Sequence, residues 1–141
     1  MSAEFCDANV LIYAHDVTAG EKRVRAQRLL ERLWDSGEGV VSIQVFQEFF
    51  MNITRKVLRP LSPLQAREVI AQLIAWQVVA PVHSDVLAAI DRSLLWRVSF
   101  WDAMVLTAAI KAGASVLWSE DLNHGQSYDG TVVRNPFRSD P

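Results

Sequence analysis

The sequence has little of what marks several large classes of protein. A single cysteine, Cys6, excludes an internal disulfide and is typical of a reducing compartment. The 14 Lys and Arg nearly balance the 16 Asp and Glu, so the net charge of −2 neither indicates nor excludes a nucleic-acid partner. No apolar run reaches the ~18 residues that span a bilayer, and the first residues lack the basic start of a secretory signal. We therefore expect a cytoplasmic protein with no membrane partner.

Several common catalytic motifs are also missing. The three histidines have no metal-ligand spacing and Cys6 is alone, which argues against a zinc site. We expect His124 to be an ordinary loop residue. The sequence has neither the glycine fingerprint of dinucleotide-binding proteins nor a phosphate-binding GK[ST] loop. It also lacks the G-x-S-x-G elbow of serine hydrolases.

What is present is a chain of 141 residues, 50% hydrophobic, in which strand and helix patterns alternate. This length and composition predict one domain with a sizeable core. We predict one strand that ends at Asp7. We predict further strands over residues 40–42, 77–82, 115–118 and 131–134. We predict helices after Asp7, over residues 20–36, 43–57 and 103–112, after Ser62-Pro63, and capped by Ser84. The alternation predicts an α/β domain of three layers, with a mainly parallel sheet of four to five strands flanked by helices.

Three aspartates are predicted to meet at one edge of this sheet. Asp7 ends a buried strand, and the carboxyl ends of parallel strands form the ligand-binding edge of an open sheet. The helix that begins near Asp102 rises about 15 Å. The strand and loop from Ser115 to Asp121 return at most ~20 Å in the opposite direction. Asp102 and Asp121 are therefore expected at the same edge as Asp7.

Glu48 is a fourth candidate, because its helix leaves the strand at residues 40–42 from that edge and Glu48 lies nearly opposite the apolar stripe. Each acid also has a purely structural interpretation. Glu48 is equally compatible with a solvated helix face, Asp102 with a capping box begun by Ser99, and Asp121 with a turn. Converging carboxylates repel one another unless a cation neutralises them. Oxygen ligands select a hard dication, Mg²⁺ or Mn²⁺.

The order of these acids resembles the PIN-domain ribonucleases, specifically toxins of the VapC type. The first motif of that family is similar to Asp7-Ala8-Asn9 and the apolar run after it, and the helical Glu is similar to Glu48. The third motif resembles Trp101-Asp102-Ala103, and the fourth resembles Ser119-Glu120-Asp121. The resemblance runs from residue 4 to about residue 137. Asn9 stands where many members have Thr or Ser, and the loop over residues 122–128 is longer and more polar than expected.

The resemblance implies a metal-dependent endoribonuclease that is a homodimer and is held inactive by a cognate VapB-like antitoxin. It implies that Asp7, Asp102 and Asp121 hold Mg²⁺ or Mn²⁺, and that Glu48 binds the metal or orients the attacking water. Asn9 and Ser119 are expected to support this site. Candidate RNA contacts, from their charge, are Lys56, Arg59 and a basic helix that contains Lys22, Arg23, Arg25, Arg28 and Arg32.

Two other functions stay open. A catalytically silent PIN-like dimer would act as a protein-binding module, and its stability would not depend on divalent ions. An aspartyl-phosphate phosphatase of the haloacid dehalogenase type needs a second Asp two residues after the nucleophile, and Asn9 occupies that place. Trp34 and Trp76 are compatible with a partner surface, although core filling is the simpler interpretation.

Overall fold

The computed structural model describes residues 2–138, which form an α/β domain around one sheet. The sheet has six strands in the order β3-β2-β1-β4-β6-β5. All neighbouring strands pair in parallel except β5 and β6, which are antiparallel. The strands are β1 (Glu4–Cys6), β2 (Gly39–Ser42), β3 (Gln77–Val79), β4 (Val116–Trp118), β5 (Ser127–Tyr128) and β6 (Thr131–Arg134). The predicted fold class is confirmed, and the described sheet has one strand more than the largest number expected.

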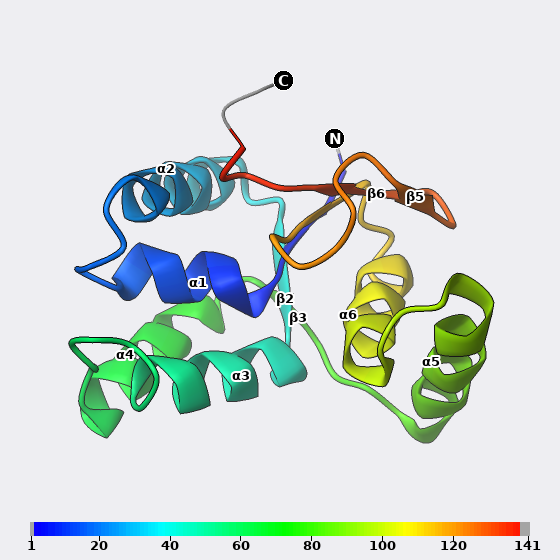
Figure 1. Ribbon diagram of the computed structural model, residues 1–141, viewed down its shortest axis with the longest axis horizontal. Helices are drawn as coiled ribbons and strands as arrows, with labels where there is room; N and C mark the ends of the chain where they lie inside the picture. The colour runs from blue at the N-terminus through cyan, green and yellow to red at the C-terminus, as the bar shows by residue number, and fades with distance from the viewer. Residues whose placement is uncertain (1, 139–141) are drawn as a thin grey trace.

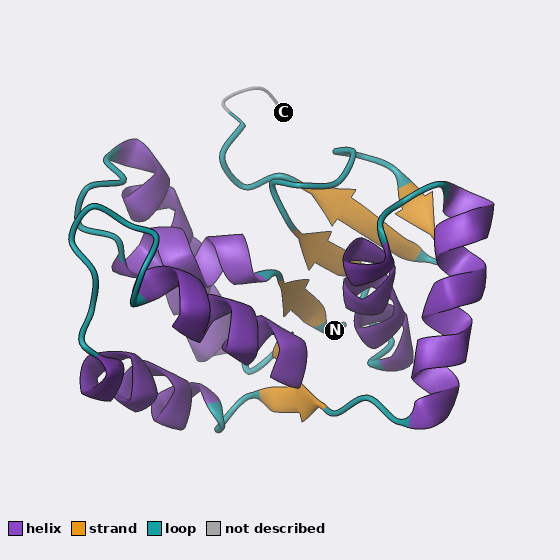
Figure 2. Ribbon diagram, turned by 60° about the horizontal axis from the view of Figure 1, so that its bottom comes forward, coloured by secondary structure: helices purple, strands orange, loops and turns teal. Residues whose placement is uncertain are grey.

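Six helices cover the described sheet as outer layers. They are α1 (Ala8–His15), α2 (Glu21–Ser36), α3 (Ile43–Ile53), α4 (Pro63–Leu73), α5 (His83–Trp96) and α6 (Phe100–Lys111). Figures 1 and 2 show α1 to α4 on one side of the sheet and the α5–α6 hairpin on the other. The three-layer arrangement predicted from the alternating pattern is therefore present.

The centre of the sheet is the pair β1 and β4. Phe5 is in register with Val40 of β2 on one side and with Leu117 of β4 on the other. The backbone N–H of Asp7 donates to the carbonyl of Trp118 at 2.9 Å, which extends the pairing one residue beyond β1. Because β1, β2 and β4 are parallel, the residues that follow them emerge at the same edge.

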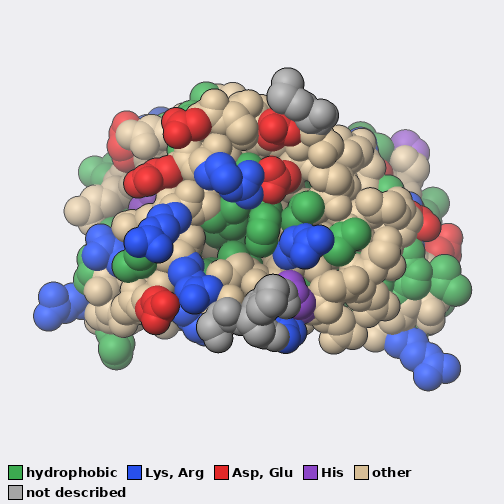
Figure 3. All heavy atoms as spheres, turned by 90° about the horizontal axis from the view of Figure 1, so that it is seen from above, with side chains coloured by type: hydrophobic (Ala, Val, Ile, Leu, Met, Phe, Trp, Pro, Cys, Tyr) green, Lys and Arg blue, Asp and Glu red, His purple; other side chains and the backbone are tan. Residues whose placement is uncertain are grey.

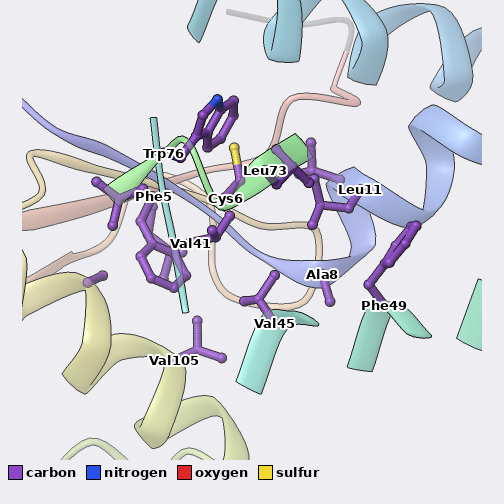
Figure 4. Packing of buried hydrophobic residues seen from close by; sticks show 14 of the residues in the cluster. Phe5, Cys6, Ala8, Leu11, Val41, Val45, Phe49, Leu73, Trp76 and Val105 are labelled. Carbon is purple, nitrogen blue, oxygen red and sulfur yellow. The ribbon is translucent and has the colours of Figure 1, made fainter. Parts of the chain in front are cut away.

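The main core contains Phe5, Leu11, Val41 and Phe49, which are fully buried, and it extends to both faces of the sheet, because Figure 4 shows the Phe5 ring directed toward Val105 of α6. Burying a side chain of this size contributes roughly 1.5–3 kcal/mol relative to leaving it exposed. Helix α6 buries residues on nearly all of its faces, as its apolar sequence predicts, and its Val105 belongs to the same core. This packing fixes the positions of the helix starts at the carboxyl edge of the sheet.

Side-chain caps begin the helices at that edge. Asp7 accepts a hydrogen bond from the N–H of Ala8, and Ser42 accepts one from the N–H of Val45. Ser99 likewise caps α6. Away from the edge, Ser62 caps α4 and Pro63 is its first residue, as predicted.

Four details of the sequence interpretation are wrong. Helix α3 ends at Ile53 instead of residue 57, because the chain turns there and Leu61 N–H donates to the Ile53 carbonyl. Strand β3 ends at residue 79 instead of 82. Helix α5 begins at residue 83, so Ser84 is not its cap; the Asp85 carboxylate accepts from Val82 N–H instead. Strand β5 was not predicted.

Two tryptophans divide between core and surface. Trp76 is buried against Trp34 in an edge-to-face contact with ring centroids 5.6 Å apart, whereas Trp34 is 45% exposed. Core filling therefore explains Trp76.

Within residues 2–138, no single helix is long and apolar enough to cross a bilayer. Helices α5 and α6 reach the required length and composition only as a pair that is bent by 114°.

Candidate active site

The candidate site is built around Asp7, which is 4% exposed at the carboxyl end of β1. One carboxylate oxygen accepts from the Ala8 N–H at 2.7 Å. The other accepts from the hydroxyl of Ser119 at 2.7 Å, and Ser119 directly follows β4. These two hydrogen bonds fix the orientation of the carboxylate, because both of its oxygens have a defined donor.

Asn9 connects the first turn of α1 to the loop after β4. Its side-chain amide donates to the Asp121 carboxylate at 3.2 Å, and its side-chain oxygen accepts from Glu120 N–H at 3.4 Å. The Asp121 N–H in turn donates to the Ser119 hydroxyl oxygen at 3.1 Å. Asp7, Asn9, Ser119 and Asp121 thus form one hydrogen-bonded group, and Asn9 is placed to position Asp121.

Glu48 and Asp102 approach the same edge from α3 and α6. Glu48 is half-buried, and its carboxylate accepts from the Gln44 side-chain amide at 2.9 Å. The same amide nitrogen donates to the Trp101 carbonyl at 3.3 Å, which ties α3 to the start of α6. Asp102 is half-buried in the first turn of α6, and its N–H donates to Ser99 as the predicted cap requires. Gln44 was not identified from the sequence, where it reads as one more polar helix residue.

The four carboxylates interact electrostatically. Burial, together with the negative charges of Glu48 and Asp121, raises the pKa of Asp7 to about 7 against the opposing hydrogen bonds from Ser119 and Ala8. Burial and the charge of Asp121 also raise the pKa of Asp102, against the hydrogen bond from Ser99. The folded chain alone therefore disfavours negative charge at this edge.

The side chains are not arranged as a finished metal site. Among residues 2–138, no three His, Cys, Asp or Glu side chains lie close enough together to form a metal-binding group. The donor chemistry nonetheless suits a hard dication, since the converging groups are carboxylates. The raised pKa of Asp7 points the same way, because a buried carboxylate that repels its neighbours is one that a cation would stabilise.

A family model for the PIN domain matches residues 5–127. The chain belongs to the PIN domain family. The match extends from β1 to the start of β5, so it contains all four candidate acids.

Two solved structures have the same fold as this PIN domain. One is described as a toxin-antitoxin complex from Klebsiella pneumoniae; it is 18% identical, with a TM-score of 0.69 over 96% of this chain and 98% of that one. The other is VapC20 of Mycobacterium tuberculosis, described as a Sarcin-Ricin loop cleaving toxin. It is 19% identical, with a TM-score of 0.62 over 84% of this chain and 90% of that one. A comparison with curated protein sequences found no match.

The two candidate RNA contacts of the PIN domain differ in their positions. Lys56 lies in a surface groove that is also lined by Tyr13 and by Asn9, a residue of the site. Arg59 is exposed and is not among the residues that line this groove.

The basic helix is α2, and several of its cations already have protein partners. Lys22 pairs with Glu120, and Arg32 makes a two-pronged contact with Glu4. Arg25 donates to the carbonyl of Arg138. Figure 3 shows a face on which acidic and basic side chains are interspersed. These pairings favour the interpretation of α2 as a solvated face. Lys22 also links α2 to the site loop, because Glu120 lies between Ser119 and Asp121.

Proposed function

We propose that this PIN domain is an endoribonuclease that depends on Mg²⁺ or Mn²⁺ and hydrolyses phosphodiester bonds of RNA. The observation on which the proposal rests is that Asp7, Glu48, Asp102 and Asp121 interact electrostatically at the carboxyl edge of a PIN domain. The fold likeness to VapC20, whose description is that of an RNA-loop cleaving toxin, supports the same chemistry.

In this proposal Asp7, Asp102 and Asp121 would hold the cation, directly or through water, and Glu48 would bind it or orient the attacking water. When bound, the cation would lower the pKa of a water molecule at the site and would offset negative charge on the phosphate. The oxygen of water attacks phosphorus, and the bond from phosphorus to the leaving ribose oxygen breaks.

The supporting residues act by holding these carboxylates in place. Ser119 donates to Asp7, Asn9 donates to Asp121, and Gln44 donates to Glu48. Groups that orient ligands in this way typically change metal affinity or activity about 10–100-fold when they are removed.

The test is cleavage of a mixed RNA pool in Mg²⁺ and in EDTA. Wild type should cut only with the metal, and Asp7→Asn and Asp102→Asn should abolish cutting. Asp35→Asn removes an exposed acid of α2 and serves as the matched control. Unchanged cleavage by either site variant would reject the assignment.

A second candidate is the catalytically silent binding module. It is favoured by one observation: within residues 2–138, no three His, Cys, Asp or Glu side chains lie close enough together to hold a metal ion. It predicts that neither stability nor RNA turnover depends on divalent ions.

We also infer that the enzyme is the toxin of a type II toxin–antitoxin pair, that it forms a homodimer, and that it acts in the cytoplasm, where its RNA substrate would be. The Klebsiella structure of the same fold is described as a toxin-antitoxin complex, which supports a VapB-like antitoxin as partner. Co-expression with the product of an adjacent small open reading frame should suppress RNA cleavage and give a complex that co-purifies. A chain that remains fully active when co-expressed with that product would contradict this inference.

A further inference from the structure

A second surface groove lies directly beside Glu48, between α3 and the start of α6. It has a volume of about 300 Å³, at the lower end of the roughly 300–1,000 Å³ that is usual for small-ligand sites. Its lining residues are Gln44, Gln47, Glu48, Met51, Asn52 and Trp101. The side chain of Trp101 is 62% exposed, although a tryptophan normally buries most of its large apolar surface.

The exposed Trp101 has one contact to its ring and one to its backbone. Its neighbour Phe100 packs against it edge to face, with ring centroids 5.0 Å apart. Its carbonyl accepts from Gln44, and the same amide nitrogen donates to the Glu48 carboxylate. The backbone of Trp101 is therefore tied to a proposed catalytic carboxylate, and its exposed ring offers a flat apolar surface in the groove that Glu48 also lines.

The chemistry of the groove suits a nucleobase better than a phosphate. Glu48 is the only charged residue among its lining residues and would repel a phosphate. The amides of Gln44, Gln47 and Asn52 offer neutral donors and acceptors of the kind that read base edges.

A cation lies in the adjoining groove, beyond Asn52, which lines both grooves. This adjoining groove contains Lys56, whose charge suits the phosphate backbone; it also contains Asp16, whose carboxylate accepts from the Thr18 N–H and hydroxyl. Two grooves that share Asn52 are thus lined by an aromatic ring and the candidate catalytic acid in one, and by a cation in the other.

We propose that Trp101 stacks on a nucleobase next to the scissile phosphate of a single-stranded RNA, and that the groove around it is the binding site for that base. The proposal rests on the proposed ribonuclease function and adds a positioning residue that determines which strand conformation is cut. Stacking on an aromatic side chain is tolerant of base identity, so the site selects an unpaired base over a paired one.

The experiment measures binding of short single-stranded RNA in EDTA, where no turnover is expected, and cleavage of the same RNA in Mg²⁺. Trp101→Ala should weaken binding and raise KM on the order of 10-fold to 100-fold, as for loss of one stacked base, with a much smaller change in kcat. Trp101→Phe should restore most of the affinity. Trp34→Phe, at an exposed tryptophan of α2, should behave as wild type and should keep the quenching of tryptophan fluorescence by RNA, whereas Trp101→Phe should lose it.

An RNA series with one abasic nucleotide at each position identifies the stacked base. At that position, wild type and Trp101→Ala should bind equally, because the interaction is already missing. If Trp101→Ala binds more weakly than wild type by the same factor at every abasic position, the proposal is overturned.

Further outcomes separate this proposal from the function on which it rests. If wild type cleaves RNA and Trp101→Ala does so with the same KM, stacking is refuted and the nuclease stands. If wild type neither binds nor cleaves RNA, both fail. If Trp101→Ala leaves RNA binding intact but changes the oligomeric state or the capture of a protein partner, Trp101 belongs to a protein interface and the proposal is overturned.

Discussion

Without a metal, the stability of the protein should fall as the pH rises from 5 to 8, and Asp7 should be the main cause. The pKa of Asp7 is about 7 in the folded chain, against 3.8 for an ordinary aspartate. Between these values the folded state retains a proton that the unfolded state has released. A state that binds more protons is favoured at lower pH, so the free energy of unfolding decreases as the pH rises through this window.

The size of the effect follows from the shift. At about 1.4 kcal/mol per pKa unit, a shift of roughly three units corresponds to about 4 kcal/mol over the whole range and to about 3 kcal/mol between pH 5 and pH 8. Asp7 is 4% exposed, so solvent does little to screen it. Asn at this position cannot ionise, and we expect Asp7→Asn to flatten the pH dependence. Its amide faces the Ser119 hydroxyl, whose oxygen can accept from it, so the change in this hydrogen bond alters stability by at most ~1 kcal/mol, and equally at every pH.

The measurement is urea unfolding in EDTA at pH 5, 6, 7 and 8, followed by tryptophan fluorescence. The quantity of interest is the change with pH in the difference between wild type and Asp7→Asn, since contributions common to both cancel. Asp35→Asn should show the full wild-type slope. The lowered pKa values of Glu4 and Asp85 affect stability only in more acidic solution, and the raised pKa of Asp102 contributes equally to wild type and to Asp7→Asn. Parallel curves for wild type and Asp7→Asn would refute the reasoning.

Three other predictions concern the same structure. Mg²⁺ at a hundred times its Kd should add about 2.7 kcal/mol to the free energy of unfolding and so raise the melting temperature. A melting temperature that does not change with Mg²⁺ would count against a metal site. Ser119→Ala should raise the pKa of Asp7 further and reduce RNA cleavage about 10–100-fold, because it removes the hydrogen bond that favours the ionised carboxylate; a pH profile of cleavage displaced to higher pH would report the change. Gly39→Ala should destabilise the protein by roughly 1–3 kcal/mol in thermal or urea unfolding, since a Cβ there would lie 2.6 Å from the Trp76 ring; an unchanged midpoint would show that the ring can move.

The sequence was sufficient for the topology that brings the acids together. Asp7 interrupts an apolar passage, and a parallel sheet sends all such residues to one edge, so its position could be deduced without coordinates. The return of the chain from Asp102 to Asp121 followed from a count of residues, because helix rise and strand rise are fixed. The roles of these acids stay predictions, since no metal or RNA tests them.

The hydrogen bonds that orient the acids could not be deduced in this way. The contact of Asn9 with Asp121 and that of Gln44 with the Trp101 carbonyl depend on side-chain positions to within an ångström. Residue spacing and hydrophobic period do not contain such information. A rule of helix or strand geometry places a residue on a face, and the packing of the whole domain then decides its partner.

The missed strand had a local signal. Asp129-Gly130 joins β5 to β6, and both residues have positive φ, 49° and 90°. An Asp-Gly pair between short strand-like segments is a strong indicator of a tight hairpin. The loop over residues 122–128 seemed too long and polar because its last two residues belong to this hairpin.

The order of the elements along the chain determines when the candidate site is complete. Asp7 follows the first strand, whereas the Ser119 hydroxyl that orients it comes 112 positions later. A nascent chain that lacks β4 leaves one side of β1 unpaired, and it also lacks Ser119 and Asp121. In the proposed ribonuclease, this order of elements would keep the active site incomplete until most of the chain has been translated.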